Sequence, residues 1–335
     1  MTAAPIRSIA ISTGGGDAPG LNAVIRATVS AALRRGWECV GIRDGYNGLL
    51  VPERYPQGGL VPLTHERVRG ISHLGGTILG TTNKGDPFHF PVRNPDGSMG
   101  ERDRSDELVA CFAQNGIDAL VTVGGDGSLS IAHELHRKGL RVVGVPKTID
   151  NDLDKTFTTF GFDTAVAFAT ECLDRLHSTA ESHQRVMVVE VMGRYAGWIA
   201  LHTGIAGNAH AVLIPEIPFD IDKVAAKVVA RDVEGHPYTI VLVAEGAEPA
   251  HGHREVVEAA EIGHAERLGG IGERVGRRSR RAPAGTREWW CSATCCAAAA
   301  RPPSTGWRPC ASEQPPCARW ARGSPASWWR SAFRM

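Results

Sequence analysis

The sequence predicts an α/β protein with mainly parallel sheets, and three observations support this fold class. Short apolar runs at 9–13 and 119–123 each end in a glycine turn, and each turn is followed by a segment with helical periodicity. A further apolar run at 141–145 completes a βαβ unit after the second turn. The loops after these strands are therefore expected at the carboxyl ends of a parallel sheet, where open α/β proteins bind ligands.

The first unit begins close to the amino terminus. After the strand at 9–13, Gly14, Gly15 and Gly16 form a turn, and residues 21–33 carry apolar side chains at helical spacing. Glycines allow a tight bend and leave no side chain between the backbone and a bound phosphate. Such a turn more often only connects a strand to a helix than binds a nucleotide. It supports a nucleotide site here because a second turn of the same kind follows.

The second unit carries the most informative chemistry of the chain. The strand at 119–123 leads into the turn Gly124–Ser128, a helix is expected at 129–138, and after the strand at 141–145 Pro146 begins an aspartate-dense loop. That loop, 146–152, reads Pro-Lys-Thr-Ile-Asp-Asn-Asp. The turn offers N–H groups to phosphates, and the loop offers carboxylates to a metal ion or a proton. Phosphoryl transfer is the reaction class that needs both.

Length and composition favour a cytoplasmic protein. The 335 residues suffice for two domains, and no run of about eighteen apolar residues could span a membrane. No segment has the charged start and apolar centre of a signal peptide. We therefore expect neither a membrane nor a nucleic acid as a partner. Two later segments complete the outline, a strand at Thr239–Ala244 and a charged helix at Glu255–Arg267.

The composition changes abruptly near residue 276. Residues 277–335 contain eleven Arg, two Glu, no Lys and no Asp, together with five of the eight Cys and six of the eight Trp. Such a segment could function as a metal site, a disulfide knot or a nucleic-acid-binding arm. None of them fits well, because Cys295 and Cys296 are adjacent, no His lies beyond His264, and the apolar residues show no period.

Four motifs resemble, in order, the signatures of the 6-phosphofructokinase family. They are residues 15–26, the turn 124–128, the loop 148–152 and the stretch 182–194. The resemblance extends from about residue 6 to about residue 275. It implies two Rossmann-like three-layer domains with the active site in the cleft between them. Residues 1–155 would be the nucleotide-binding domain, and residues 156–275 an incomplete sugar-phosphate-binding domain.

The resemblance also implies a reaction. The γ-phosphoryl group of ATP would pass to the 1-hydroxyl of fructose 6-phosphate, a committing step of glycolysis, with Mg²⁺ as the cofactor. Asp150 would accept the hydroxyl proton, and Asp126 would help to hold the metal ion. The catalytic set is Asp150, Thr148, Lys147 and Arg194. The ATP site is Gly16, Lys84, Gly125, Asp126, Gly127 and Ser128, with Asp126 as the metal ligand. The sugar-phosphate site is Thr148, Ile149, Asp150, Arg185, Met192, Gly193, Arg194 and Glu245.

The resemblance further implies that the chain binds copies of itself. A sugar phosphate is a dianion, and in the family the arginine at the position of Arg185 reaches into the site of a neighbouring subunit. We therefore expect a homodimer or a homotetramer. Glu245 would accept a hydrogen bond from a sugar hydroxyl.

Two other functions compete with this one. Pyrophosphate-dependent relatives typically carry an aspartate at the position of Gly127 and a lysine at the position of Lys147, so the two positions disagree. We favour ATP, because a carboxylate at residue 127 would crowd and repel the nucleotide. The remaining alternative is a non-catalytic, ligand-binding subunit.

A family loop of the form Gly-His-X-X-Arg-Gly-Gly, expected soon after residue 280, is absent from the sequence. Residues 289–297, written as GC-rich codons and read one base earlier, give Val-Val-Leu-Gly-His-Leu-Leu-Arg. We interpret residues 276–335 as an aberrant, frameshifted and disordered tail, with the frame changing near Val275 to Ser279. A chain carrying this tail would have impaired catalysis, since phosphate-binding groups of that loop are lost.

Overall fold

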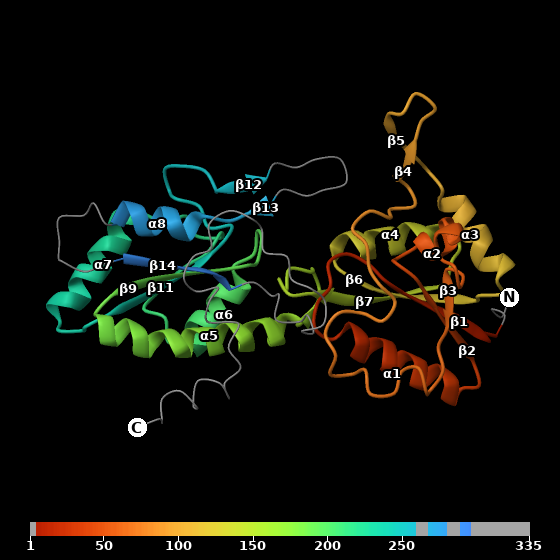
Figure 1. Cartoon of the computed structure of the whole chain (residues 1–335), viewed down its shortest axis with the longest axis horizontal. Coiled ribbons are helices and arrows are strands. Elements are labelled where there is room, and N and C mark those ends of the chain that lie inside the picture. Colours follow the sequence, from red (N-terminus) through yellow and green to blue (C-terminus); the bar gives the residue numbers. More distant parts are fainter. Residues whose placement is uncertain (1–4, 259–266, 280–288, 296–335) are drawn as a thin grey trace, which may run out of the picture. The chain divides into compact units, whose positions relative to one another are not determined.

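The computed structural model describes residues 5–258, 267–279 and 289–295. They form two compact units (Figure 1), of which the first comprises residues 5–168, 258 and 267. The second comprises residues 169–257, 268–279 and 289–295. Each unit is an α/β structure around a mainly parallel sheet, as the sequence predicts.

The first unit contains a six-stranded sheet in the order β3-β2-β1-β6-β7-β8. Only β3 runs antiparallel to its neighbour, and the other pairs are parallel. The turns after β1 and β6 therefore emerge side by side at one edge of the sheet. The strands are β1 (Ser8–Thr13), β2 (Glu38–Ile42), β3 (Leu60–Pro62), β6 (Ala119–Gly124), β7 (Val142–Thr148) and β8 (Phe160–Gly161).

Helices cover both faces of this sheet (Figure 1). Ile9 and Ile11 point to one face and pack with residues of α1 (Leu21–Arg34), whereas Ala10 between them packs on the other face. This alternation follows from the two-residue period of a strand. The second face is covered by α2 (Asn47–Leu50), α3 (Ser105–Gln114) and α4 (Asp126–Arg137), and the short η1 (Pro52–Arg54) follows α2.

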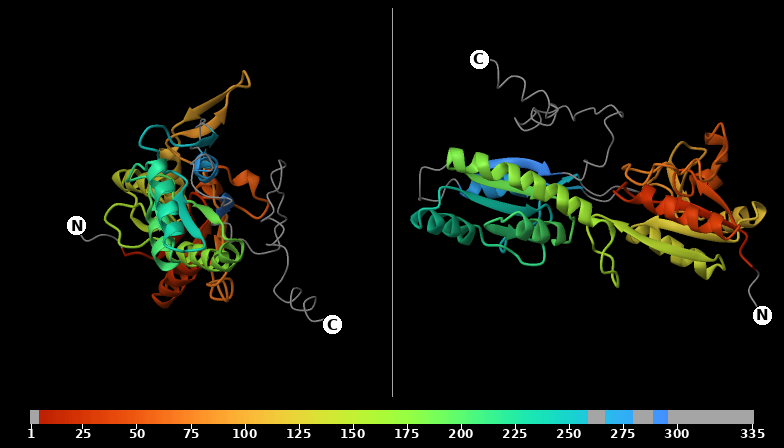
Figure 2. Two further views of the ribbon diagram at one scale, coloured as in Figure 1. Left: turned by 90° about the vertical axis from the view of Figure 1, so that its left-hand side faces the viewer. Right: turned by 90° about the horizontal axis from the view of Figure 1, so that it is seen from below.

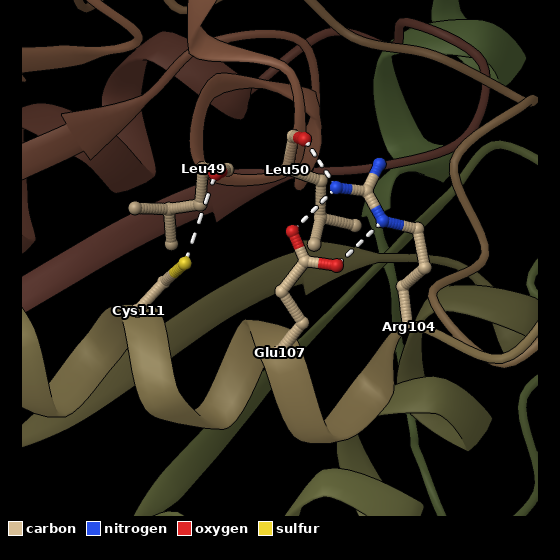
Figure 3. A network of polar contacts seen from close by, with 5 residues as sticks. All are labelled: Leu49, Leu50, Arg104, Glu107 and Cys111. Carbon is tan, nitrogen blue, oxygen red and sulfur yellow. Dashed lines mark hydrogen bonds and ion pairs between the residues drawn. The ribbon is translucent and has the colours of Figure 1, made fainter.

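A hairpin of β4 (Phe90–Arg93) and β5 (Met99–Arg102) stands away from the body of the first unit (Figures 1 and 2). Arg104, two residues after the hairpin, fixes the start of α3 (Figure 3). Its guanidinium donates to the carbonyl oxygen of Leu50 at 2.7 Å and to Glu107 Oε2 at 2.8 Å. The ion pair lowers the pKa of Glu107. Because the same guanidinium lies over the Phe90 ring, one side chain joins the hairpin, α2 and α3.

The second unit contains a parallel four-stranded sheet in the order β10-β11-β9-β14. Val188 and Val241 lie in a core with residues of α7 and α8, and Leu173 of α5 packs beneath Gly207 at the end of α6. The strands are β10 (Ala211–Leu213), β11 (Thr239–Ala244), β9 (Val186–Val191) and β14 (Trp289–Cys295). The helices are α5 (Phe162–His183), α6 (Trp198–Ala206), α7 (Ile221–Val233) and α8 (Ile271–Ser279).

The carboxylate of Glu190 anchors α8 to the sheet of the second unit. Glu190 lies in β9 and is 3% exposed. It accepts hydrogen bonds from the N–H groups of Gly270, at 3.0 Å, and Gly272, at 2.8 Å, where α8 begins. Burial raises the pKa of this carboxyl group, while the two N–H donors oppose the shift.

The structure differs from the sequence prediction at two boundaries in the first unit. Helix α4 begins at Asp126 rather than at 129, because an acidic residue in the first turn is favoured by the helix dipole. Strand β7 extends through Thr148 rather than ending at 145, because Lys147 and Thr148 pair with β8. The first unit continues beyond β8 to Phe168.

The later part of the chain also differs from expectation. Residues 255–267 were expected to be helical, but β12 (Val256–Glu258) and β13 (Arg267–Leu268) form a two-stranded sheet there. Within the expected disordered tail, α8 continues to Ser279 and β14 pairs with β9 through backbone hydrogen bonds. Residues 259–266, 280–288 and 296–335 lie outside the described residues. Of the helices that the structure describes, none is long and apolar enough to cross a bilayer.

Candidate active site

The two glycine turns of the first unit meet at one edge of its sheet. Strands β1 and β6 are neighbours, and the N–H of Gly14 donates to the carbonyl oxygen of Val123 at 3.0 Å. The hydroxyl of Ser128 fills the space between the turns. A Cβ atom on Gly14 would lie 2.6 Å from Ser128 Oγ, and one on Gly124 would lie 2.5 Å from it. Bare backbone is therefore required at both positions for the turns to approach.

Two other glycines of these turns face open space. A Cβ atom added to Gly16 or to Gly127 would meet no atom within 4 Å. Gly127 lies in the first turn of α4, and the residue before this helix, the N-cap Gly125, makes no side-chain capping bond. The first N–H groups of a helix attract anions. Gly16, Gly127 and the amino end of α4 therefore offer an accessible surface of backbone N–H groups, with the exposed carboxylate of Asp126 beside it.

A third turn, at 80–84, packs against the first glycine turn. Thr81 Oγ1 donates to the carbonyl oxygen of Gly15 at 2.5 Å, and the N–H of Gly15 donates to the carbonyl oxygen of Thr82 at 3.2 Å. Thr13 Oγ1 at the end of β1 donates to the carbonyl oxygen of Gly80. These contacts bring the exposed Lys84 to the same edge of the sheet. Sequence reasoning selected Lys84 but not the two threonines that hold its turn.

Lys147 connects the acidic loop to the first glycine turn. Its ammonium nitrogen donates to the carbonyl oxygen of Gly16 at 2.5 Å, and the residue is 4% exposed. Burial lowers the pKa of the ammonium group, and the carboxylates of Asp17 and Asp150 oppose that shift. The position of Asp17 near this cation was not expected from the sequence.

The acidic loop holds Asp150 through the preceding threonine. Thr148 Oγ1 accepts from the backbone N–H of Asp150 at 3.2 Å and lies 3.4 Å from Asp150 Oδ2. Asp150 is half-buried. Ile149 between them faces Gly161, where an added Cβ would lie 3.3 Å from its side chain. The side chain of Ile149 is thus a packing group, and its neighbours carry the polar atoms of the loop.

In the second unit, Met192, Gly193 and Arg194 form the loop after β9. Glu245 Oε1 accepts from the N–H groups of Gly193, at 3.3 Å, and Arg194, at 3.0 Å. Glu245 follows β11 and is 6% exposed, so its carboxylate fixes the shape of this loop. This contact was not expected from the sequence, which suggested only a bond to a sugar hydroxyl. Arg194 itself is exposed, with a positive φ of 49°.

Arg185 lies at the other end of β9. Its carbonyl oxygen accepts from the N–H of Thr239, which begins β11. Arg194 follows the opposite end of the same strand, and six residues of strand span about 20 Å. The structure therefore brings Met192, Gly193, Arg194 and Glu245 together but leaves Arg185 remote from them within the chain.

The chain is similar in sequence and in fold to proteins that carry a functional name. A scan against protein families matches phosphofructokinase over residues 8–282. The ATP-dependent 6-phosphofructokinase of Chloroflexus aurantiacus is 53% identical over 268 residues, which cover 80% of this chain and 71% of that protein. The pyrophosphate–fructose 6-phosphate 1-phosphotransferase of Amycolatopsis mediterranei is 46% identical over 283 residues, covering 81% and 77%. Pichia pastoris phosphofructokinase in the T-state superimposes with a TM-score of 0.67 at 31% identity, over 86% of this chain and 29% of that longer one.

Proposed function

The chain belongs to the phosphofructokinase family, and we infer that it transfers the γ-phosphoryl group of ATP to the 1-hydroxyl of fructose 6-phosphate. Relatives about half identical to it are named ATP-dependent 6-phosphofructokinases, which makes glycolysis its pathway. The observation that carries the inference within the chain is the convergence of two glycine turns and one aspartate loop on a single sheet edge. We further propose that the enzyme acts in the cytoplasm.

We propose that Asp150 is the general base. The sugar hydroxyl becomes a better nucleophile as its proton passes to a carboxylate within hydrogen-bond reach. Thr148 supports this role, because its hydroxyl receives the backbone N–H of Asp150 and lies close to one carboxylate oxygen. Asp150 therefore starts from a fixed backbone position.

The phosphates of ATP would bind along the open glycines. Gly16, Gly125, Gly127 and Ser128 present backbone N–H groups and a hydroxyl, and no side chain blocks Gly16 or Gly127. The amino end of α4 adds the positive end of a helix dipole. Lys84, exposed on the adjoining turn, and Lys147, with its charge beside the Gly16 carbonyl, would neutralise the transferring phosphates.

The donor set suits Mg²⁺ held mainly by the nucleotide. Among the described residues, no three His, Cys, Asp or Glu side chains gather as a metal site of their own. Asp126 is an exposed carboxylate at the first position of α4, beside the open glycines. A magnesium ion bound through one carboxylate, waters and phosphate oxygens requires no more than this. When bound, the ion would neutralise charge on the β- and γ-phosphates.

Fructose 6-phosphate would contact the loop after β9. Arg194 would supply a guanidinium to the sugar phosphate or to the transferring group, and Met192 and Gly193 would shape the surface below it. Glu245 would hold this loop by accepting its two N–H groups.

We propose that the enzyme is a homodimer or homotetramer in which Arg185 serves the site of another copy. Arg185 lies about 20 Å along β9 from Arg194, so it cannot join Arg194 on a sugar phosphate in its own chain. An arginine supplied by a second copy would complete the cationic side of each site.

Pyrophosphate is the second candidate donor. It is favoured by Lys147 and by the Amycolatopsis relative, whose name specifies pyrophosphate. ATP is favoured by Gly127, because the space around this position would admit a nucleotide that a carboxylate would repel. An assay of fructose 1,6-bisphosphate formation with each donor decides between them. Activity with pyrophosphate alone would overturn the assignment of ATP.

The activity of the chain depends on its C-terminal tail, residues 276–335. We propose that a frame change near Val275 to Ser279 replaced the natural end of the protein. The family match ends at residue 282, and the Chloroflexus protein is covered over only 71% of its length. We expect a chain whose reading frame has been restored to be active. The chain that ends in residues 276–335 should be weakly active or inactive. Equal, full activity of both chains would contradict this proposal.

The same comparison tests the non-catalytic alternative. If both chains bind ATP but neither forms product with either donor, the chain is a ligand-binding subunit. Sequencing of the coding DNA around codon 275 gives an independent answer on the frame.

A further inference from the structure

The loop that follows Asp150 is tied together by one side-chain amide. Asn151 Oδ1 accepts from the backbone N–H of Thr159 at 2.9 Å and lies 3.4 Å from Thr159 Oγ1. Asn151 Nδ2 donates to the carbonyl oxygen of Phe157 at 3.4 Å. The residue next to the proposed base thus binds the far side of its own loop.

Thr159 extends this tie to the strand below Asp150. It is 2% exposed, and its hydroxyl donates to the carbonyl oxygen of Thr148 at 2.6 Å. Thr148 in turn receives the N–H of Asp150 through its own hydroxyl. A continuous set of hydrogen bonds therefore runs from Asn151 through Thr159 and Thr148 to Asp150.

The backbone of Asn151 also sets the direction of the loop. Its φ is +55°, in the left-handed region that asparagine tolerates better than most residues. This turn redirects the chain immediately after Asp150. Asn151 is therefore needed both for a backbone conformation and for an amide with an acceptor and a donor.

Apolar packing does little to hold this loop. Leu153 is buried, but Phe157 is fully exposed, and Asp152, Asp154 and Lys155 are exposed as well. A surface loop with a single buried apolar side chain depends largely on its hydrogen bonds for a single conformation. The hydroxyl of Thr156 bonds locally to the Leu153 carbonyl oxygen, whereas the amide of Asn151 and the buried hydroxyl of Thr159 join the two ends of the loop.

We propose that Asn151 and Thr159 form a clamp that positions the Asp150 carboxylate for proton removal. Both are positioning residues and neither touches the substrate. The proposal rests on the proposed function, in which Asp150 is the general base. A misplacement of about 1 Å at a reacting group can reduce a rate about 100-fold, so a loose loop would lower kcat.

The first test separates the amide from the backbone turn, and all kinetic variants are made in the frame-restored chain, which is the one expected to be active. Asn151→Gly keeps access to the left-handed conformation and removes both amide contacts. Asn208→Gly is the matched control, because Asn208 also has a positive φ, of 52°, and lies in the second unit. We expect Asn151→Gly to lower kcat about 10-fold to 100-fold with little change in KM for fructose 6-phosphate or in Tm. The control is expected to retain wild-type values.

The second test uses the hydroxyl of Thr159. Thr159→Val removes the bond to the Thr148 carbonyl at nearly constant volume, and Thr159→Ser restores the hydroxyl. We expect the valine variant to lose kcat and the serine variant to recover most of it. If kcat falls equally in both variants, or if a fall in Tm accounts for the lower kcat, Thr159 has only a structural role and the clamp proposal is wrong.

Amide hydrogen exchange in the full chain tests the clamp without catalysis. The N–H of Thr159 should exchange faster in Asn151→Gly than in the wild type and stay unchanged in Asn208→Gly. Unchanged exchange at Thr159 would overturn the clamp. Faster exchange with full kcat would overturn its positioning role.

Asp150→Asn distinguishes failure of the clamp from failure of the function on which it rests. If this variant keeps wild-type activity, the assignment of the base is wrong. If it is inactive while Asn151→Gly and Thr159→Val are fully active, only the clamp is wrong.

Discussion

The ammonium nitrogen of Lys147 lies 2.5 Å from the carbonyl oxygen of Gly16, which joins the aspartate loop to a turn 131 residues earlier in the chain. The Lys147 side chain is buried, and the carboxylates of Asp17 and Asp150 influence the same cation. A single charged side chain therefore connects the surface that would bind phosphates with the group that would take the proton.

Replacing Lys147 by methionine tests this connection, and this kinetic prediction and the next two refer to the frame-restored chain. Lys147→Met keeps a long, buried side chain but removes the charge and leaves the Gly16 carbonyl without this donor. Each charge-assisted hydrogen bond is worth about 1.5–3 kcal/mol, so kcat/KM for the phosphoryl donor should fall at least about 10-fold in steady-state assays. Lys138→Met, which removes an ion pair to Asp106 on the helix face, should leave it unchanged. Equal kinetics of both variants would refute the connection.

A carboxylate at residue 127 should discriminate against ATP. Gly127→Asp introduces no backbone strain, since a Cβ there meets no atom and φ is not positive. Its charge would face the phosphates, and we expect KM for ATP to rise at least about 10-fold, a loss of about 1.4 kcal/mol. The uncharged Gly127→Asn separates repulsion from bulk. If the two variants bind ATP equally well, charge at this position does not select the donor.

Mixing two inactive variants tests whether Arg185 acts between copies. Arg185→Ala and Asp150→Asn should each be nearly inactive. In a mixed dimer, one of the two sites would contain both an intact Asp150 and the Arg185 of the other chain. Equal amounts, refolded together, should regain about a quarter of the wild-type rate for a randomly mixed dimer. No recovery despite mixed assembly would show that Arg185 does not serve a second site.

His210 should make the protein less stable in mild acid. Burial, together with nearby charges such as Arg231, lowers its pKa from 6.5 to about 4. Its Nδ1 accepts from the N–H of Ile240 at 2.8 Å, a bond that the protonated ring cannot make. The unfolded chain therefore binds the proton first, and the free energy of unfolding should decrease as pH falls from about 6.5 to about 4. In urea titrations His210→Asn, which keeps an acceptor, should show a weaker decrease. Parallel curves would exclude His210 as the cause.

Elements with a strong local signal were predictable from the sequence. The strand at Thr239–Ala244 was predicted with the bounds that the structure has, and the first helix differs by a single residue at its end. Apolar periodicity and flanking glycines decide these boundaries locally. The predicted start of α4 was three residues too late. Gly127 is typical of a turn, but it lies inside the helix.

Contacts between distant segments were not predictable. Nothing in the local sequence indicates that Lys147 meets Gly16, that Glu245 holds the loop at Gly193, or that Glu190 anchors α8. The strand β14 belongs to the same class, because its residues lack any period and it forms by pairing with β9. Such features depend on which backbone lies alongside in the folded chain.

The length of β9 sets the distance between the two arginines that flank it. This buried strand carries Arg185 before its first residue and Arg194 shortly after its last. A slip of one residue would displace either end by about 3.3 Å and exchange the buried faces of the strand. If its two ends serve different copies of the chain, the number of residues in β9 is a spacing that two active sites share, and neither site can alter it independently.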